Sequence, residues 1–563
     1  MIAVYLDSAV EKYSRQVRFT LEYIFNISGF CWKYLDADSV LSPNDVILFY
    51  SPNLPDQQYI DWMIKNHSLI YIPFLRDFYV KGFISGETLK NNFKVFAKEE
   101  MPYISIKKSI LSPFDIEEAE AGKYCIYQFD IIGNVFFHLS DDNRAHIKKK
   151  DKKGNINFKE FGFYDYFDTP YINEYINLFT YTVKKVLEFK NITGIRCCLW
   201  PSNQPFATVI THDLDKMQKW SIFSLVLSFF ENIFLLVTFR LPSLFKNLYS
   251  ILKYLLSNIE DYWNIHEITS LEKKFNIKST WFVGVNNERK RFYDYEIDDT
   301  DLRSEFLTLL ENGSEIGLLH KSSDKGRGRI TFDIEKLMSS LKLKKLGIRH
   351  VNHYTESDTL DMLQNEIGLK YDSSRKLNDK NSFYNGFALP YPMYCGEAMI
   401  PNQTVYQFPV HFTDEFLRIN KYKNINLTES MNLINEKIEK VKSVKGSLHI
   451  QLSNSLYHDI SYTPKLYDFI FNELKDSNAY VTTCSGMIEW LDLKRKIEIQ
   501  ENGNRILIKF NDYIEQVTFE IIGNKIVSNV EEGNCSVNRN FVQFVNVFDG
   551  LNVEINVIDM EEE

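Results

Sequence analysis

The stretch Ala207–Asp215, ATVITHDLD, decides how the rest of the chain is interpreted. Its first half is apolar and β-branched, as in a buried strand, and its second half is polar and acidic. Side chains alternate between the faces of a strand, so Asp213 and Asp215 point one way and Leu214 points the other. Two carboxylates on one face repel each other, and a divalent cation relieves that repulsion. At such a strand end one aspartate can bind a metal ion while the other acts as a base. The alternative is that the two aspartates cap a helix or form a salt bridge in a loop.

Strand-like and helix-like segments alternate along residues 200–492. The predicted strands are Thr208–His212, Thr280–Val285, Ser314–Leu319, Leu346–Val351, Leu369–Tyr371, Val405–Phe412, Leu448–Leu452 and Tyr480–Thr483. The clearest predicted helices are Glu335–Leu346, Asp358–Ile367, Leu427–Val444 and Pro464–Leu474. Seven or eight β/α units in this range favour a deformed (β/α)7–8 barrel over a flat sheet. Active sites of such barrels lie at the carboxyl ends of the strands.

Two further domains are predicted beside the barrel. Residues 1–195 contain short apolar runs and one helical stretch, Tyr171–Phe189, and form a predicted N-terminal α/β domain. Residues 495–563 alternate apolar and polar side chains around Asn502-Gly503, a dipeptide that favours a tight hairpin turn. This pattern predicts a small all-β, sandwich-like domain. The predicted fold class is therefore α/β, with the barrel at residues 200–492 between an α/β domain and a β domain.

Composition narrows the class of protein. The 563 residues carry a net charge of −10, and the Lys and Arg residues are spread along the chain. Nucleic acid binding needs a concentrated basic surface, so nucleic acid is not an expected partner. The seven cysteines are odd in number and form no CxxC pair, which is typical of reduced thiols in a cytoplasmic protein. The first residues lack the pattern of a signal peptide, so a cytoplasmic location is expected.

One apolar segment, Ser221–Phe239, has two interpretations. It is nearly long enough to span a bilayer, but Glu231-Asn232 at its centre makes a transmembrane span the least favoured. Helical periodicity continues through residue 258. The first interpretation is a helical insertion packed on the barrel. The second is a hairpin at residues 221–258 that lies on a membrane or on a partner protein, which would make the protein membrane-associated.

Further predicted strand ends also carry polar groups. Glu315–His320, EIGLLH, ends in a common metal ligand, and Asp324 follows four residues later. If the chain turns helical there, His320 and Asp324 share a face and can chelate one ion. The other polar strand ends are Gly347–Tyr354, Tyr371–Ser374 and His449–Asn454. Together they have the layout of a barrel active site.

These segments resemble the motifs of the polysaccharide deacetylase family, the NodB homology domain of carbohydrate esterase family 4. Thr211–Asp215 is similar to the first motif, T-H-D-x-D. Glu315–His320 resembles the second, E-I-G-x-H, with one extra residue before the histidine. Gly347–Arg349 resembles the arginine motif, and Tyr371–Ser374 resembles Y-D-S-S. Gln128–Ser140 resembles part of an N-terminal domain found in one branch of the family.

The resemblance implies a metal-dependent enzyme that removes acetyl groups from N-acetylated sugars of a bacterial surface polysaccharide. An acetylated glycan is the implied substrate, and a divalent ion, expected to be Zn²⁺, is the implied cofactor. Asp213 would act as general base, Arg349 would hold Asp213, and His449 would protonate the leaving amine. The implied metal ligands are Asp215, His320, Asp324 and His353, with His350 as an alternative to His353.

Departures from the family pattern leave an alternative function open. Asp324 stands where the family has a second metal-binding histidine. Ser453 stands near the place of the late catalytic histidine, so His449 or His458 would have to supply the proton. Ala388 replaces the arginine of a G-F-R segment. The alternative is a catalytically degenerate, deacetylase-like protein that binds glycans or helps assemble them.

Overall fold

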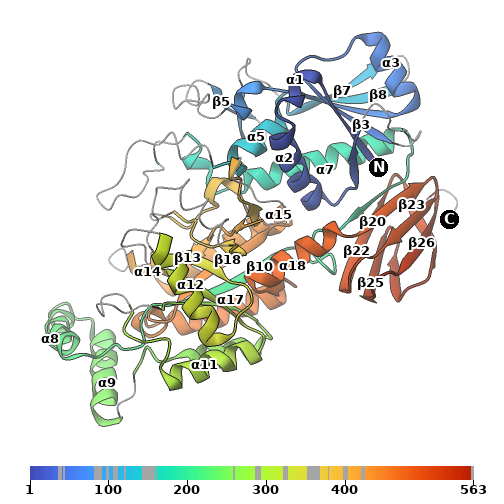
Figure 1. Cartoon of the computed structure of the whole chain (residues 1–563). Helices are drawn as coiled ribbons and strands as arrows, with labels where there is room; N and C mark the ends of the chain where they lie inside the picture. The colour runs from blue at the N-terminus through green and yellow to red at the C-terminus, as the bar shows by residue number, and fades with distance from the viewer. Residues whose placement is uncertain are drawn as a thin grey trace.

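The structure is a computed structural model. It describes residues 1–35, 41, 45–80, 92–96, 101–105, 112–119, 122–141, 159, 162–257, 260–285, 293–320, 327–351, 368–377, 380–396, 404–419 and 425–559. Three parts follow one another along the chain in Figure 1: a blue α/β part, a green-to-orange part with a central sheet, and a red β part. The predicted α/β class is confirmed. The predicted helix Asp358–Ile367 lies outside the described residues.

The N-terminal part is a six-stranded sheet with helices on both faces. The strand order is β2-β1-β3-β4-β8-β7, and the strands are parallel except β7. Alternate residues of β3 and β4 face two separate apolar clusters, which is expected of a sheet buried on both sides. The strands are β1 (Ile2–Leu6), β2 (Trp32–Tyr34), β3 (Val46–Ser51), β4 (Ser68–Pro73), β7 (Phe114–Ala119) and β8 (Gly122–Tyr127). The helices are α1 (Ser8–Glu11), α2 (Ser14–Ser28), α3 (Gln57–Asn66), α5 (Ile131–Leu139) and α7 (Tyr171–Phe189), the last with the predicted bounds.

The central part alternates strands and helices, as predicted. Its strands are β10 (Ala207–Leu214), β11 (Thr280–Val283), β12 (Glu315–His320), β13 (Gly347–His350), β14 (Tyr371–Asp372), β15 (Tyr391–Pro392), β16 (Tyr406–Gln407), β17 (Phe412–Thr413), β18 (Ser447–Ser453) and β19 (Tyr480–Thr482). Its helices outside the hairpin described below are α10 (Ile265–Lys274), α11 (Thr300–Glu311), α12 (Arg327–Leu341), α14 (Glu415–Ile419), α15 (Leu427–Ser443), α16 (Leu456–Asp459), α17 (Thr463–Asp476) and α18 (Cys484–Arg495). The neighbouring strands from β16 through β14, β13, β12, β11 and β10 to β18 are all parallel.

One continuous segment, residues 406–413, connects the two ends of this run of strands. The amides of Tyr406, Phe408 and Val410 donate to β14 and the residues beside it, at 3.1, 2.8 and 2.7 Å. The next amide along, that of His411, donates to the carbonyl of His449 on β18 at 3.0 Å, and β17 then pairs with β18. The sheet thus curls until its two ends share one segment. This closure gathers the carboxyl ends of the parallel strands around a common interior.

The C-terminal part contains two four-stranded sheets. Their orders are β20-β21-β26-β23 and β24-β25-β22-β9. The strands are β20 (Glu498–Asn502), β21 (Arg505–Lys509), β22 (Ile514–Ile522), β23 (Lys525–Glu531), β24 (Cys535–Asn538), β25 (Phe541–Val547) and β26 (Asn552–Asp559). Rings of Phe510, Phe519 and Phe544 pack together between the sheets. The remaining strand, β9 (Gly194–Cys197), comes from the connection between the first two parts and pairs antiparallel with β22.

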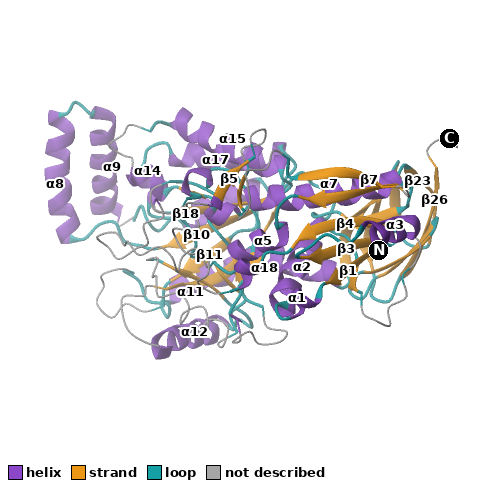
Figure 2. Cartoon of the chain, turned by 90° about the horizontal axis from the view of Figure 1, so that it is seen from above, coloured by secondary structure: helices purple, strands orange, loops and turns teal. Residues whose placement is uncertain are grey.

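Two helices project from the central part, α8 (Ile222–Val237) and α9 (Leu241–Ser257). They lie side by side at one end of the molecule in Figures 1 and 2. The helical periodicity of residues 221–258 therefore corresponds to a hairpin. Among the described residues, no helix combines the length and the apolar run that crossing a bilayer requires.

Candidate active site

A buried ion pair inside the curled sheet joins Arg349 of β13 to Asp213 of β10. Nη1 of Arg349 lies 2.5 Å from Oδ1 of Asp213, and both side chains are almost wholly buried. The second oxygen of Asp213 accepts from the amide of Gln451 at 2.6 Å. Both carboxylate oxygens are therefore held, and the orientation of the group is fixed. The contact between Arg349 and Asp213 implied by the family resemblance is present.

Arg349 is positioned by further partners on other strands. Its Nη2 donates to the hydroxyls of Thr211 and Ser373 at 2.9 and 2.6 Å, and its Nε donates to the carbonyl of Ser373 at 3.1 Å. The guanidinium also lies over the ring of Phe282, 4.1 Å from the ring centre. Few rotamers satisfy all of these contacts, so Arg349 is a rigid donor to Asp213.

Two glycines make room for the aromatic rings beneath this cluster. A Cβ at Gly347 would lie 1.9 Å from the ring of Tyr371, and a Cβ at Gly317 would lie 2.7 Å from the ring of Phe282. The hydroxyl of Tyr371 in turn donates to Glu315 at 2.9 Å. Interior packing therefore explains why Glu-Ile-Gly and Gly-Ile-Arg contain glycine at positions 317 and 347. Glu315 is explained by its hydrogen bond with Tyr371, below the site.

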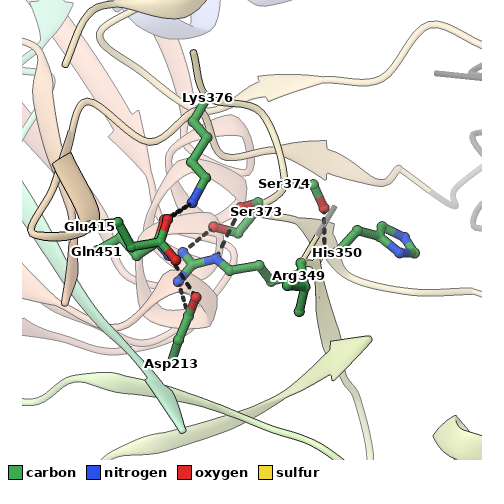
Figure 3. Close-up of a pocket in the computed structure, with 9 residues that line it drawn as sticks. Asp213, Arg349, His350, Ser373, Ser374, Lys376, Glu415 and Gln451 are labelled. Atoms are coloured by element: carbon green, nitrogen blue, oxygen red, sulfur yellow. Dashed lines mark hydrogen bonds and ion pairs between the residues drawn. The ribbon is translucent and has the colours of Figure 1, made fainter. Parts of the chain in front are cut away.

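A small cavity opens beside Asp213. It is lined by Asp213, Arg349, His350, Val351, Ser373, Ser374, Lys376, Glu415 and Gln451. Figure 3 shows Asp213, Gln451, Glu415 and Lys376 converging around the guanidinium of Arg349. Lys376 donates to Glu415 at 2.6 Å and to the side-chain oxygen of Gln451 at 3.1 Å, which orients the Gln451 amide toward Asp213. Burial raises the pKa of Asp213, and the charge of Arg349 opposes that rise.

Asp215 lies two residues further along, at the mouth of the curled sheet. Its oxygens accept from the hydroxyls of Ser453 and Ser455 at 3.2 and 3.0 Å, and its amide donates to the side chain of Asn454 at 3.2 Å. Burial raises the pKa of Asp215 to about 6, and the nearby charge of Asp213 acts in the same direction. These side-chain partners are neutral hydroxyls, so this carboxylate is chemically suited to a cation.

The register of the strands determines which way His320 points. Asp213 pairs with Phe282, and Phe282 pairs with Gly317. Paired residues of neighbouring strands project from the same face, and successive residues alternate. Leu319 therefore shares the interior face with Asp213, and His320, the next residue, lies on the opposite face. The one extra residue in Glu315–His320, relative to E-I-G-x-H, therefore moves the histidine from the interior face of the strand to the opposite face.

His320 has partners of its own on that face. Its Nδ1 lies 3.2 Å from an oxygen of Asp333 on α12, and its ring contacts the ring of His350 edge-on at 5.3 Å. In Figure 3 the side chain of His350 points away from Asp213. Burial lowers the pKa of His350 to about 4, so the imidazole is neutral at physiological pH. The structure thus brings His320 to His350 and Asp333, while Asp213 and Asp215 contact other groups.

His449 lies beneath Arg349 inside the curled sheet. Its Nε2 is 3.1 Å from Nη2 of Arg349, whose two hydrogens are shared among Thr211, Ser373 and His449; a guanidinium can only donate, so Nε2 faces it as an acceptor. Burial, followed by the charge of Arg349, holds the pKa of His449 well below its usual range. His458 lies elsewhere, on α16, where its Nε2 is 2.9 Å from Glu267. The geometry of His449 is that of a neutral group that supports Arg349.

Two predicted metal ligands, Asp324 and His353, lie outside the described residues. Within the described ranges, no three His, Cys, Asp or Glu side chains gather closely enough to hold a metal ion. The metal ligand set therefore stays a prediction from the sequence.

Lys376 and Glu415 were not predicted from the sequence. Both follow short strands, β14 and β17, and a systematic search of every strand end for charged residues would have found them. Gln451 and Ser373 fell within the predicted polar strand ends, without an assigned role.

Comparison with known proteins finds similar solved structures. The carbohydrate deacetylase Agd3 matches over 99% of this chain and 98% of its own, at 8% identity and a TM-score of 0.33. A protein described as a polysaccharide deacetylase, from Mycobacterium smegmatis, matches over 53% of this chain and 93% of its own, at 15% identity and a TM-score of 0.34. The Puue allantoinase matches over 52% and 91%, at 13% identity and a TM-score of 0.34. No family model and no curated protein matches the chain. The geometry of the site is therefore the basis for a function.

Proposed function

We propose that this chain is a metal-dependent hydrolase that removes acetyl groups from N-acetylated sugars of a bacterial surface polysaccharide. The observation that carries the proposal is the Asp213–Arg349 pair, buried beside a cavity where parallel strands end. Both residues belong to segments that resemble deacetylase motifs. Strand ends that converge in this way form the usual location of catalysis in β/α barrels.

In the proposed reaction, Asp213 acts as the general base on a water molecule. Its raised pKa makes it a stronger base than an exposed aspartate, and Arg349 keeps it ionised. Gln451 holds the other oxygen, so the carboxylate cannot rotate away from the cavity. After taking a proton from water, Asp213 can return it to the nitrogen of the leaving amine.

The bound divalent ion, proposed to be Zn²⁺, would polarise the acetyl carbonyl and lower the pKa of the attacking water. Asp215 is the proposed ligand from β10, and its neutral serine partners fit that role. His320, Asp324 and His353 are the other proposed ligands. Because His320 lies on the face opposite Asp213, the test of the metal site is placed on Asp215.

His449 was expected to protonate the leaving amine, and its contacts favour another role. A neutral imidazole that accepts from Arg349 has no acidic proton directed at the cavity through Nε2. We propose that His449 is a positioning residue that orients Arg349, and through it Asp213.

The test combines metal analysis with acetate release from a panel of N-acetylhexosamine glycans. We expect Asp213→Asn to abolish acetate release and to retain metal, and Asp215→Ala to lose the metal. Asp298→Asn, at an exposed carboxylate of the central part that does not line the cavity, is the matched control and should behave as wild type. Acetate release that survives in Asp213→Asn would contradict the base assignment. A wild-type protein that binds glycans with neither metal nor acetate release would favour the catalytically degenerate alternative.

A further inference from the structure

The α8–α9 hairpin is inserted immediately after the site, between β10 and α10. Its second helix, α9, is attached to the central part and to the segment before α8 by hydrogen bonds. Lys246 donates to the carbonyl of His458 at 2.6 Å, and the indole of Trp220 donates to Ser250 at 3.2 Å. The hairpin therefore projects as an anchored structure whose outer surface faces away from the rest of the molecule in Figures 1 and 2.

Polar residues lie between the two helices of the hairpin. The side-chain amide of Asn247 on α9 donates to Ser228 and to Asn232 on α8, both at 2.8 Å. Ser228 is buried by this contact. In a helix pair that is stable in water, the apolar side chains normally occupy the contact and the polar ones face solvent. Here a polar cluster lies in the contact, and Leu235 and Leu244 are the apolar side chains that the hairpin buries among its described residues.

The apolar side chains of the hairpin lie on its outside. Phe239 at the turn is 85% exposed, and Leu256 near the end of α9 is 82% exposed. The outward apolar residues are Val226, Leu227, Phe229, Phe230, Ile233, Phe234, Leu236, Val237, Phe239, Leu241, Phe245, Leu248, Tyr249, Leu252, Leu255 and Leu256. At 100° per residue, those of α8 cover about half of the helix circumference. The hairpin thus exposes most of its apolar side chains and keeps a polar cluster between its helices, which is the pattern of helices that contact lipid.

The charged side chains of the hairpin and the lengths of its helices indicate which lipid surface it binds and whether it lies on the bilayer or crosses it. The hairpin carries one acidic side chain, Glu231, and three basic ones, Arg240, Lys246 and Lys253, whereas the whole chain has a net charge of −10. Lys246 is bonded to the carbonyl of His458 and Lys253 lies 3.7 Å from Asp261, so Arg240, at the turn, is the basic group placed beside the apolar surface. Basic groups beside an apolar face favour an anionic lipid surface. With 16 and 17 residues, the two helices are each about 25 Å long at 1.5 Å per residue, shorter than a bilayer core of about 30 Å.

We propose that the α8–α9 hairpin docks the protein on an anionic lipid surface by lying in the interface with its apolar outer side in the lipid. A second copy of the chain fits this surface less well. The apolar surface runs over both helices and the turn between them, whereas a flat contact with another protein would cover only one side of it. The inference does not depend on the proposed deacetylase activity. It is tested by lipid binding alone.

The experiment is flotation of the full-length protein with vesicles of phosphatidylcholine, with and without phosphatidylglycerol. The test variant is Phe230→Asn/Phe239→Asn/Leu256→Asn, at three exposed positions of the hairpin. The matched control is Trp62→Asn/Phe332→Asn/Phe548→Asn, which changes three exposed apolar residues in three other parts of the chain. Because all six side chains are exposed in the free protein, both variants should fold.

We expect the wild type and the control variant to float with the vesicles that contain phosphatidylglycerol. We expect the hairpin variant to lose at least about tenfold in partitioning, because it removes three apolar side chains from the interface. Arg240→Glu should lower the preference for phosphatidylglycerol. The proposal is overturned if the wild type does not float, or if the hairpin variant floats equally well. It is also overturned if the wild type forms a dimer that the hairpin variant abolishes while no lipid binds.

Discussion

Arg349 on β13 donates to Asp213 on β10 across the interior of the curled sheet, although β11 and β12 lie between the two strands. Only the curvature of the sheet brings these two residues into contact. Asp213 therefore has its orientation and its ionisation set by a residue 136 positions away in the chain. The proposed chemistry depends on this pair, and substitutions at Arg349 test it directly.

Replacing Arg349 should change the pH dependence of acetate release. The charge of Arg349 lowers the pKa of Asp213, so Arg349→Gln should raise that pKa and keep the base protonated to higher pH. We expect the acid limb of the kcat/KM profile to move to higher pH, and kcat/KM at neutral pH to fall by roughly 10²-fold or more. Arg349→Lys keeps the charge and should shift the limb less, although it loses the fixed donor geometry. An unchanged acid limb in Arg349→Gln would show that Asp213 is not the titrating base.

Gln451 offers a complementary test, because it holds the second oxygen of Asp213 at 2.6 Å. Gln451→Glu places a second carboxylate against Asp213, and like charges raise the pKa of one member of such a pair. We expect a profile shifted to higher pH and a large loss of activity at neutral pH. Gln451→Ala removes the hydrogen bond without adding charge, so it should lower kcat with little shift in pH. Identical profiles for the two variants would contradict this role.

Gly347→Ala should destabilise the central part of the protein. The added methyl group would lie 1.9 Å from the Tyr371 ring, which is fully buried and cannot move outward without disturbing Phe282. Overpacking of this kind costs about 1–3 kcal/mol, and displacement of Tyr371 should also reduce activity. Gly162→Ala is the control, since its nearest neighbour would lie at 3.9 Å. Thermal unfolding of both variants gives the comparison, and equal midpoints would show that the ring can relax.

Asp130 predicts a pH dependence of stability in the N-terminal part. Its oxygens accept from the amides of Gly133 and Leu75 and from the hydroxyl of Tyr50, and burial raises the pKa of Asp130 to about 7. In the unfolded chain an aspartate has a pKa of about 3.9, so the folded state binds the proton more tightly. The stabilisation from this group is complete below pH of about 4 and is lost as the pH rises toward 7.

The measurement compares wild type with Asp130→Asn, which stays neutral at every pH. We expect the free energy of unfolding of the wild type to fall relative to that of the variant between pH of about 4 and 7, by up to about 1.4 kcal/mol per pH unit, and the thermal midpoint of the wild type to fall with it. A constant difference between the two proteins across this range would contradict the raised pKa.

Local patterns in the sequence predicted the elements of the central part well. Ala207–Leu214, Glu315–His320 and Ser447–Ser453 are strands within one or two residues of their predicted bounds. Their apolar, β-branched character is a local property and can be read directly. The predicted strand Val405–Phe412 is instead split between β16 and β17. The split arises because this segment pairs first with β14 and then with β18. Those two strands lie at opposite ends of the curled sheet, and their positions are not a local property of the sequence.

Local patterns also predicted part of the site, and the rest depends on the folded arrangement. Asp213 and Arg349 belong to recognisable segments, and their contact is present. The face on which His320 lies depends on one residue of register, and a one-residue change moves a side chain to the other face of a strand. Lys376 and Glu415 come from segments that have no motif, so only the folded arrangement places them beside Gln451.

The pairing of β9 with β22 has a consequence for synthesis of the protein. Arg196 of β9 forms a buried ion pair with Glu520 of β22, and 324 positions separate them. A ribosome that adds 5–20 residues per second needs roughly 15 to 65 s to cover that distance. For that time the nascent chain carries an uncompensated arginine and an open strand edge, which is the kind of segment that chaperones shield from aggregation.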